Sequence, residues 1–374
     1  MPLPKPQPGI LDIIPYKGGE AKVEGVSRVA KLSSNESPLG PSAKAVAAYM
    51  AVAAELHRYP DGGHGPLRDA LAAKWGIPAD RIVVGNGSDE LIGLLVRAFA
   101  GQGDEVLFSR HGFLMYAISA RTAGAEPVMA PEIDYRTDIE ALLAAVTPRT
   151  RIVFVTNPNN PTGSYVTAAE LRSLRDRLPA DVLMVVDSAY AEYVSRNDYS
   201  AGMELVAATD NTVVLRTFSK IYGLGGMRVG WAYGPPEFID VMNRMRGPFN
   251  VNAPAQAAAI AALADDAWVD EARRHNDKWL ARLPEGIRRI GLDTLPSVGN
   301  FLLIRFPQGS HDAAAAFRFL QRRGLILRPV GGYGLGDFLR LTIGTDDENE
   351  AVLAALADFM AAAPDTLIDP AALA

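Results

Sequence analysis

Short apolar runs alternate with longer amphipathic stretches through the middle of the chain. The runs at residues 81–84, 105–108, 151–155, 182–186 and 212–215 are rich in Val, Ile and Leu, which is typical of buried strands. The stretches between them carry apolar residues at helical spacing. Buried strands that alternate with helices predict an α/β fold, with a mainly parallel sheet that helices cover on both faces.

The pattern changes on both sides of this region. Residues 1–41 are rich in Pro, Gly and Ser and lack periodicity, so they predict an extended arm. An Ala-rich helix ends near residue 264, and a long helix, a strand, a helix, two short strands and a closing helix follow. We therefore predict a large domain over residues 42–264 and a small α/β domain over residues 265–374, which the arm joins.

Composition narrows the function classes. The net charge is −6 and the basic residues are scattered, so neither nucleic acid nor an anionic membrane is an expected partner. Prolines interrupt the first residues where a signal peptide needs an apolar segment, which predicts a soluble cytoplasmic protein. The chain has no cysteine, and its five histidines lack metal-ligand spacing, so we expect no metal site.

Two of the predicted strands lead into side chains that suit catalysis. Asp187 follows the run 182–186, and a carboxylate at the carboxyl end of a parallel strand faces the crevice where such sheets bind ligands. It either faces a pyridine nitrogen there and keeps that ring protonated, or it caps a helix. The strand at 212–215 leads to Lys220, and the nearby cation Arg228 could lower the pKa of the lysine amine and bind a phosphate.

Two polar loops follow other strands. Residues 83–90 pass from a strand through glycines into a helix, so Ser88 and Asp89 either hold a phosphate on free backbone amides or only cap the helix. Residues 157–163 contain three asparagines directly after a strand. An asparagine amide there, or Tyr190, could donate to a phenolate oxygen of a cofactor.

Together these residues resemble a known family. The loop 157–163, with Ser219, Lys220, Arg228 and Arg340, resembles the class I and II aminotransferases of fold type I, and the resemblance covers nearly the whole chain. Within that group the chain is most similar to the enzymes that act on histidinol phosphate. The segments that carry this second likeness are residues 34–41, 58–61, 85–91, 218–230 and 339–344.

The resemblance implies an aspartate-aminotransferase-like large domain with pyridoxal 5'-phosphate as cofactor. It implies that Lys220 is the Schiff-base lysine and proton shuttle, and that Asp187 faces the pyridine nitrogen. Asn157 and Tyr190 would donate to the phenolate oxygen. The catalytic residues implied are thus Lys220, Asp187 and Tyr190.

The same resemblance implies how the phosphate and the substrate are held. The residues that would bind the cofactor phosphate are Ser88, Asp89, Ser219, Arg228 and, from the partner subunit of a homodimer, Tyr59. Arg340 would clamp a substrate carboxylate through a bidentate pair, and Asn35 would line the same site.

Some positions depart from the family pattern. Phe113 stands where family members commonly place a tyrosine, so it can stack on the cofactor ring without offering a hydroxyl. Tyr16 and Arg328 match the family's contacts to the substrate phosphate. Phe113 removes one possible hydrogen-bond donor near these two residues, so more residues indicate the reaction than indicate the substrate.

The implied reaction is a ping-pong transfer of an amino group from histidinol phosphate to 2-oxoglutarate, as in histidine biosynthesis. An aromatic amino-acid aminotransferase is an alternative, because Phe113 and the apolar residues of the arm would suit a phenyl side chain. A decarboxylase of similar fold, of the threonine-phosphate type, is a further one. A cofactor-binding transcription regulator would need a basic helix-turn-helix domain, for which the acidic chain has no room.

Overall fold

The computed structural model describes residues 5–6, 9–16, 18–25 and 28–367. Parts of the predicted arm, at residues 1–4, 7–8, 17 and 26–27, and the end of the predicted small domain, at residues 368–374, lie outside the described residues.

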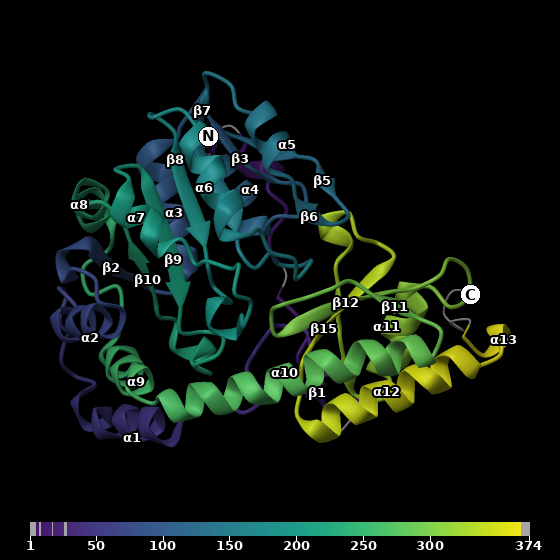
Figure 1. Ribbon diagram of the computed structural model, residues 1–374. Helices are drawn as coiled ribbons and strands as arrows, with labels where there is room; N and C mark the ends of the chain where they lie inside the picture. The colour runs from purple at the N-terminus through teal and green to yellow at the C-terminus, as the bar shows by residue number, and fades with distance from the viewer. Residues whose placement is uncertain (1–4, 7–8, 17, 26–27, 368–374) are drawn as a thin grey trace.

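A seven-stranded sheet with the order β2-β10-β9-β8-β7-β3-β4 forms the centre of the larger part of the molecule (Figure 1). Its strands are β2 (Ile82–Gly85), β3 (Glu105–Ser109), β4 (Glu126–Ala130), β7 (Thr150–Thr156), β8 (Leu183–Asp187), β9 (Thr212–Thr217) and β10 (Gly230–Tyr233). β10 runs antiparallel to β2 and β9, and the other neighbouring pairs in this sheet are parallel. The prediction of an α/β fold with a mainly parallel sheet is confirmed.

Two of these strands escaped the sequence analysis. β4 lies at the edge of the sheet, and its sequence contains a proline and exposed positions rather than an apolar run. β10 is four residues long and follows a glycine-rich turn, so it has too few positions to show a pattern.

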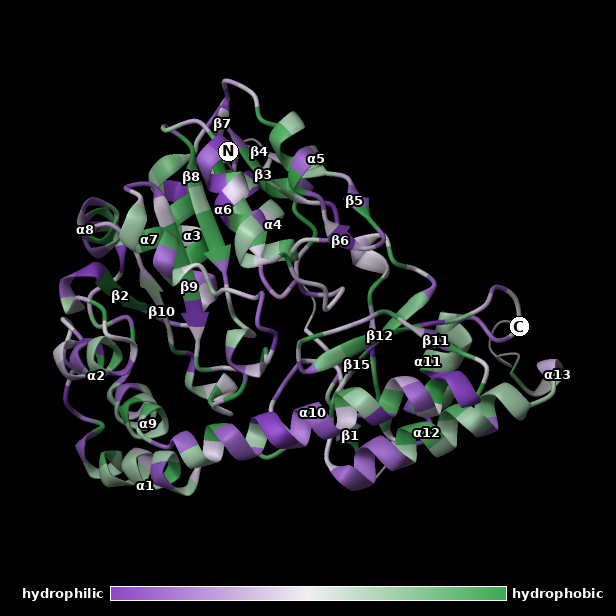
Figure 2. Ribbon diagram, in the orientation of Figure 1, coloured by the Kyte–Doolittle hydropathy of each residue, from purple (hydrophilic) through white to green (hydrophobic). Residues whose placement is uncertain are grey.

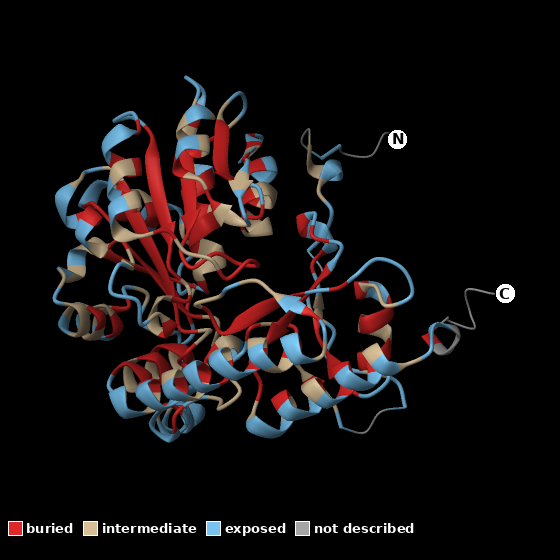
Figure 3. Cartoon of the chain, turned by 45° about the vertical axis from the view of Figure 1, so that its right-hand side comes forward, coloured by how far each residue is buried: buried red, intermediate tan, exposed pale blue. Residues whose placement is uncertain are grey.

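Both faces of the sheet are buried. Along β8, Leu183 and Val185 belong to one cluster of buried side chains, whereas Met184 and Val186 belong to another on the opposite face. This is why the central strands read as continuous apolar runs. Figure 2 shows most of the length of β8 and β9 as hydrophobic, and Figure 3 shows most of the sheet as buried. The helices of this part are α1 (Ala43–Ala51), α2 (Gly65–Trp75), α3 (Ser88–Phe99), α4 (Leu114–Ala123), α5 (Ile139–Ala144), α6 (Ala168–Arg177), α7 (Met203–Ala208), α8 (Pro236–Met245) and α9 (Ala253–Leu263).

The long helix α10 (Asp266–Arg289) leads from this part to a second, smaller one (Figure 1). There an antiparallel sheet with the order β11-β12-β15-β14 shares a core with the helices that follow α10. The elements are β11 (Asp293–Thr294), β12 (Phe301–Arg305), α11 (Ala313–Gln321), β13 (Leu325–Ile326), β14 (Arg328–Pro329), β15 (Phe338–Thr342), α12 (Asp346–Ala361) and α13 (Pro364–Leu367).

The N-terminal segment joins the smaller part through a short parallel pair. β1 (Ala30–Lys31) pairs with β13. In the larger part, β5 (Glu132–Ile133) and β6 (Arg136–Thr137) form a separate antiparallel pair that does not belong to the seven-stranded sheet. Among the described residues, no helix combines the length and the apolar character that crossing a bilayer requires.

Candidate active site

A cavity of about 320 Å³ lies at the carboxyl ends of β7, β8 and β9. The last residues of these strands, Thr156, Asp187 and Thr217, all line it. It therefore occupies the place where open α/β sheets bind ligands. The sequence-predicted residues that it brings together are Tyr16, Asn35, Ser88, Asp89, Phe113, Asp187, Tyr190, Ser219, Lys220, Arg228 and Arg340.

Lys220 lies three residues beyond β9, and its amine faces the cavity. The Nζ atom lies 5.5 Å from the centre of the Tyr190 ring and 3.5 Å from the carbonyl oxygen of Ser34. Burial, followed by the positive charge of Arg340, lowers the pKa of the Lys220 amine to about 8. The main cation that acts on this amine is thus Arg340, whereas the spacing along the chain had suggested Arg228.

Asp187 is buried at the end of β8 with its two carboxylate oxygens in different environments. Oδ2 accepts a hydrogen bond of 2.8 Å from the Tyr116 hydroxyl. Oδ1 is buried and has no hydrogen-bond partner among the described residues. Burial raises the pKa of Asp187 to about 6. Because an unpaired buried carboxylate oxygen is costly, Oδ1 marks a place for a ligand donor.

Tyr190 is held by residues from distant parts of the chain. Its hydroxyl accepts a hydrogen bond of 2.9 Å from the side-chain amide of Asn35. Asn35 itself has a positive φ of 54° and is fixed by two hydrogen bonds with Thr342. The ring of Tyr190 packs edge-on against Phe301. The smaller part of the molecule thereby sets the position of a hydroxyl in the cavity.

One end of the cavity suits an anion. Helix α3 starts at Ser88, so the first backbone N–H groups of that helix have no partner within it. Arg228 donates to the Ser219 hydroxyl at 3.3 Å and to Asp89 at 3.1 Å. A Cβ at Gly87 would lie 2.3 Å from the Arg228 guanidinium, so only glycine lets Arg228 approach the helix start.

Arg340 lies on β15 and reaches across to the cavity from the smaller part. Its guanidinium donates to the Asn160 side-chain oxygen at 2.6 Å and to the Ser33 carbonyl at 2.8 Å. Its Nε is buried and has no partner among the described residues. A buried, partly unsatisfied guanidinium at a cavity wall can bind a carboxylate.

Asn157 does not line the cavity, although the sequence predicted that its side chain would contact the cofactor there. Its side chain is fully buried, its amide nitrogen donates to the carbonyl oxygens of Val166 and Ser200, and its oxygen accepts from the Val166 N–H. All of its polar atoms are used to fix the loop. Asn160 lines the cavity instead, and because Arg340 occupies its oxygen, its amide nitrogen is the atom that could donate to a ligand.

Two other predicted residues lie outside the cavity lining. Tyr59 is 83% exposed and stacks on Phe249, with ring centres 4.7 Å apart. Arg328 does not line the cavity, but its guanidinium lies 5.8 Å from the ring of Tyr16, which does. Within one chain, Tyr59 therefore does not contribute to this cavity. Arg328 contacts the cavity only indirectly, through Tyr16.

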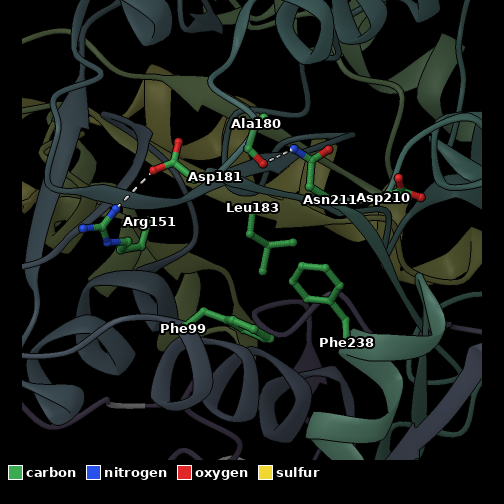
Figure 4. Close-up of a pocket in the computed structure, with 8 residues that line it drawn as sticks. All are labelled: Phe99, Arg151, Ala180, Asp181, Leu183, Asp210, Asn211 and Phe238. Carbon is green, nitrogen blue, oxygen red and sulfur yellow. Dashed lines mark hydrogen bonds and ion pairs between the residues drawn. The ribbon is translucent and has the colours of Figure 1, made fainter.

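A larger cavity of about 530 Å³ lies at the opposite, amino ends of the strands. Figure 4 shows its apolar floor of Phe99, Phe238 and Leu183, and Arg151 turned toward Asp181. None of the sequence-predicted site residues lines it. Within the described part of the chain, no cluster of His, Asp or Glu could hold a metal ion.

Among the residues that bear on the chemistry of the site, sequence reasoning missed Asn160, which lines the cavity, and Tyr116, which contacts Asp187. The only feature of the sequence that could have indicated Tyr116 is its position three residues, or about one helical turn, after Phe113. Nothing in the sequence distinguished Asn160 from Asn157, because both belong to one asparagine-rich loop.

An amine with a lowered pKa, a buried carboxylate with a free oxygen, an anion-binding end and a carboxylate-binding arginine share one cavity. Such a site can hold an anionic ring compound and move a proton next to it.

Comparisons with known proteins agree with this geometry. A family model described as aminotransferase class I and II matches residues 27–356. The histidinol-phosphate aminotransferase of Paramagnetospirillum magneticum is 58% identical over 363 residues, which cover 97% of this chain and 100% of that protein. The one from Rhodospirillum rubrum is 53% identical and covers 96% and 98%. The crystal structure of histidinol-phosphate aminotransferase from Sinorhizobium meliloti in complex with pyridoxal-5'-phosphate matches with a TM-score of 0.89 and 30% identity, covering 95% and 97%.

Proposed function

Because the chain belongs to the class I and II aminotransferases, we propose that it transfers the amino group of histidinol phosphate to 2-oxoglutarate in histidine biosynthesis. Its cofactor is pyridoxal 5'-phosphate. The single observation that supports the chemistry best is the cavity that combines Lys220 with an unpartnered oxygen of Asp187. The choice of substrate is supported by full-length relatives of that name, one of them 58% identical.

The residues of the cavity fit this cofactor group by group. Asp187 Oδ1 would face the ring nitrogen, and Lys220 would hold the aldehyde carbon. Tyr190 and Asn160 would donate to the phenolate oxygen, and Phe113 would stack on the ring. The residues that would hold the phosphate are Ser88, Asp89, Thr217, Ser219 and Arg228.

When bound, pyridoxal phosphate draws electrons away from the substrate carbon that bears the amino group. Lys220 Nζ accepts the proton that leaves this carbon and later returns it, which its lowered pKa of about 8 makes possible near neutral pH. Asp187 keeps the opposite end of the site negatively charged. Asn35 holds the Tyr190 hydroxyl in place during both transfers.

Arg340 has a different role in each of the two half-reactions. Glutamate and 2-oxoglutarate carry an α-carboxylate, which the guanidinium can bind in a bidentate pair. Histidinol phosphate lacks that carboxylate, so its phosphate needs another cation. Tyr16 and Arg328 are proposed for this contact, because Tyr16 lines the cavity and the Arg328 guanidinium lies 5.8 Å from its ring.

We further propose a homodimer with shared active sites. Val46, Tyr49 and Met50 of α1 are exposed apolar side chains, and two of them line an apolar hollow of about 240 Å³ next to Leu224. A second copy of the chain would cover this surface. Tyr59, which serves no site in its own chain, would then reach the phosphate end of the partner's cavity.

A substrate panel tests the proposed function. The purified protein, loaded with pyridoxal phosphate and supplied with 2-oxoglutarate, should convert histidinol phosphate with a kcat/KM at least about a hundredfold above those for phenylalanine and tyrosine. Lys220→Ala should abolish both this activity and the absorbance band near the visible edge. Negligible turnover of histidinol phosphate beside rapid turnover of phenylalanine would overturn the proposed substrate and identify an aromatic aminotransferase.

A further inference from the structure

Tyr116 lies beneath the floor of the active-site cavity and does not line it. Its hydroxyl is 2.8 Å from Asp187 Oδ2 and 2.8 Å from the Thr156 hydroxyl. A phenol has one proton to give. When Asp187 is ionised, that proton goes to the carboxylate, so Thr156 donates to the Tyr116 oxygen. The three side chains form a directed chain of hydrogen bonds that ends on Asp187.

The phenol ring of Tyr116 is fixed by aromatic packing. It is fully buried, stacks on Phe154 with ring centres 4.2 Å apart, and contacts Phe108 edge-on at 5.7 Å. Its edge also meets Phe113 at 5.9 Å with an interplanar angle of 89°. The hydroxyl therefore has a single position, and the same ring supports the residue that would stack on the cofactor.

We propose that Tyr116 is a positioning residue, which holds Asp187 by Oδ2 so that Oδ1 is presented to the ring nitrogen of the cofactor. This inference rests on the proposed function, because it assumes that pyridoxal phosphate occupies the cavity. Tyr116 touches neither cofactor nor substrate and acts only through Asp187 and Phe113. Its removal would leave the carboxylate free to turn.

Tyr116 also favours the charged form of the carboxylate. Burial is the main influence on Asp187 and raises its pKa, and the negative charge of Asp89 adds to this, whereas the hydrogen bond from Tyr116, the Ala189 N–H and the charge of Lys220 lower it. Without the phenol hydroxyl the balance shifts toward the neutral carboxyl. A neutral carboxyl attracts a protonated ring nitrogen poorly.

The test is the affinity of the cofactor-free protein for pyridoxal phosphate, measured by equilibrium dialysis. Tyr116→Phe keeps the ring packing and removes only the hydroxyl, and we expect it to raise the dissociation constant about tenfold or more, as for the loss of one hydrogen bond to a charged group. Thr156→Val removes the preceding donor and should raise the constant by about threefold.

A double-mutant cycle separates positioning from a general structural role. In an Asp187→Ala background, Tyr116→Phe should change the dissociation constant by less than about twofold, because no carboxylate is left to orient. An unchanged affinity in Tyr116→Phe alone, or an equal loss in both backgrounds, would overturn the proposal. If Tyr116→Phe does not fold, as judged by circular dichroism, Thr156→Val and its cycle decide in the same way. Failure of the unmodified protein to bind pyridoxal phosphate would instead refute the proposed function.

Discussion

Asn157 and Asn160 lie three positions apart in one loop, and the structure gives them opposite roles. Asn157 holds the loop to the protein, whereas Asn160 lines the cavity beside Arg340. Asn157→Ala should therefore lower the free energy of unfolding strongly and kcat only weakly. Asn160→Ala should lower kcat strongly and the free energy of unfolding only weakly.

The hydrogen bonds set the expected sizes. Asn157 makes hydrogen bonds of 3.0, 3.1 and 3.2 Å to backbone groups of Val166 and Ser200. At about 1 kcal/mol for each bond that leaves a buried partner unsatisfied, its removal should lower the free energy of unfolding by roughly 3 kcal/mol. The side-chain oxygen of Asn160 accepts one hydrogen bond, from Arg340. Asn160→Ala should therefore lower the free energy of unfolding by about 1 kcal/mol. Loss of an amide that faces developing charge should lower kcat by about a hundredfold.

Urea unfolding of the cofactor-free variants and single-turnover kinetics of the loaded variants measure the two effects separately. An Asn157→Ala variant that is as stable as the unmodified protein but inactive would contradict the structural role of Asn157. An Asn160→Ala variant that keeps the full kcat would contradict the role of Asn160 in the reaction. Asn159→Ala is not a suitable control, because the side-chain amide of Asn159 donates hydrogen bonds to the Thr162 hydroxyl and the His111 carbonyl oxygen.

Further outcomes follow from the charges of the site. The rate at which the cofactor-free protein captures pyridoxal phosphate should rise with pH and level off above about 8, because the Lys220 amine must be neutral to react and its pKa is lowered; stopped-flow absorbance measures this, and a rise continuing toward the ordinary lysine value of 10.5 would contradict it. Arg340→Gln should raise the KM for 2-oxoglutarate by about tenfold or more, with a much smaller effect on the half-reaction of histidinol phosphate; equal effects in both would argue against its role as a carboxylate clamp. If the site is shared, an equimolar mixture of Tyr59→Ala and Lys220→Ala chains, each nearly inactive, should regain about a quarter of the full activity after exchange of subunits; no gain in a mixture shown to exchange would exclude sharing through Tyr59.

The sequence by itself determined the α/β fold and the positions of the main chemical groups. Alternating apolar runs give the sheet, because a strand buried on both faces must be apolar throughout. Asp187 and Lys220 could be placed because each follows such a strand closely, and a short connection keeps it at the carboxyl edge of the sheet. These are local relations, which the order of residues preserves.

The tertiary structure alone decided which groups act on one another. Arg340 lowers the pKa of Lys220 although Arg228 is much closer along the chain, because β15 of the smaller part faces the end of β9. Asn160 rather than Asn157 lines the cavity because of the path of their loop, and Tyr116 reaches Asp187 through the packing of α4 on the sheet. Distances between side chains on separate elements depend on how those elements pack, and no spacing along the chain encodes them.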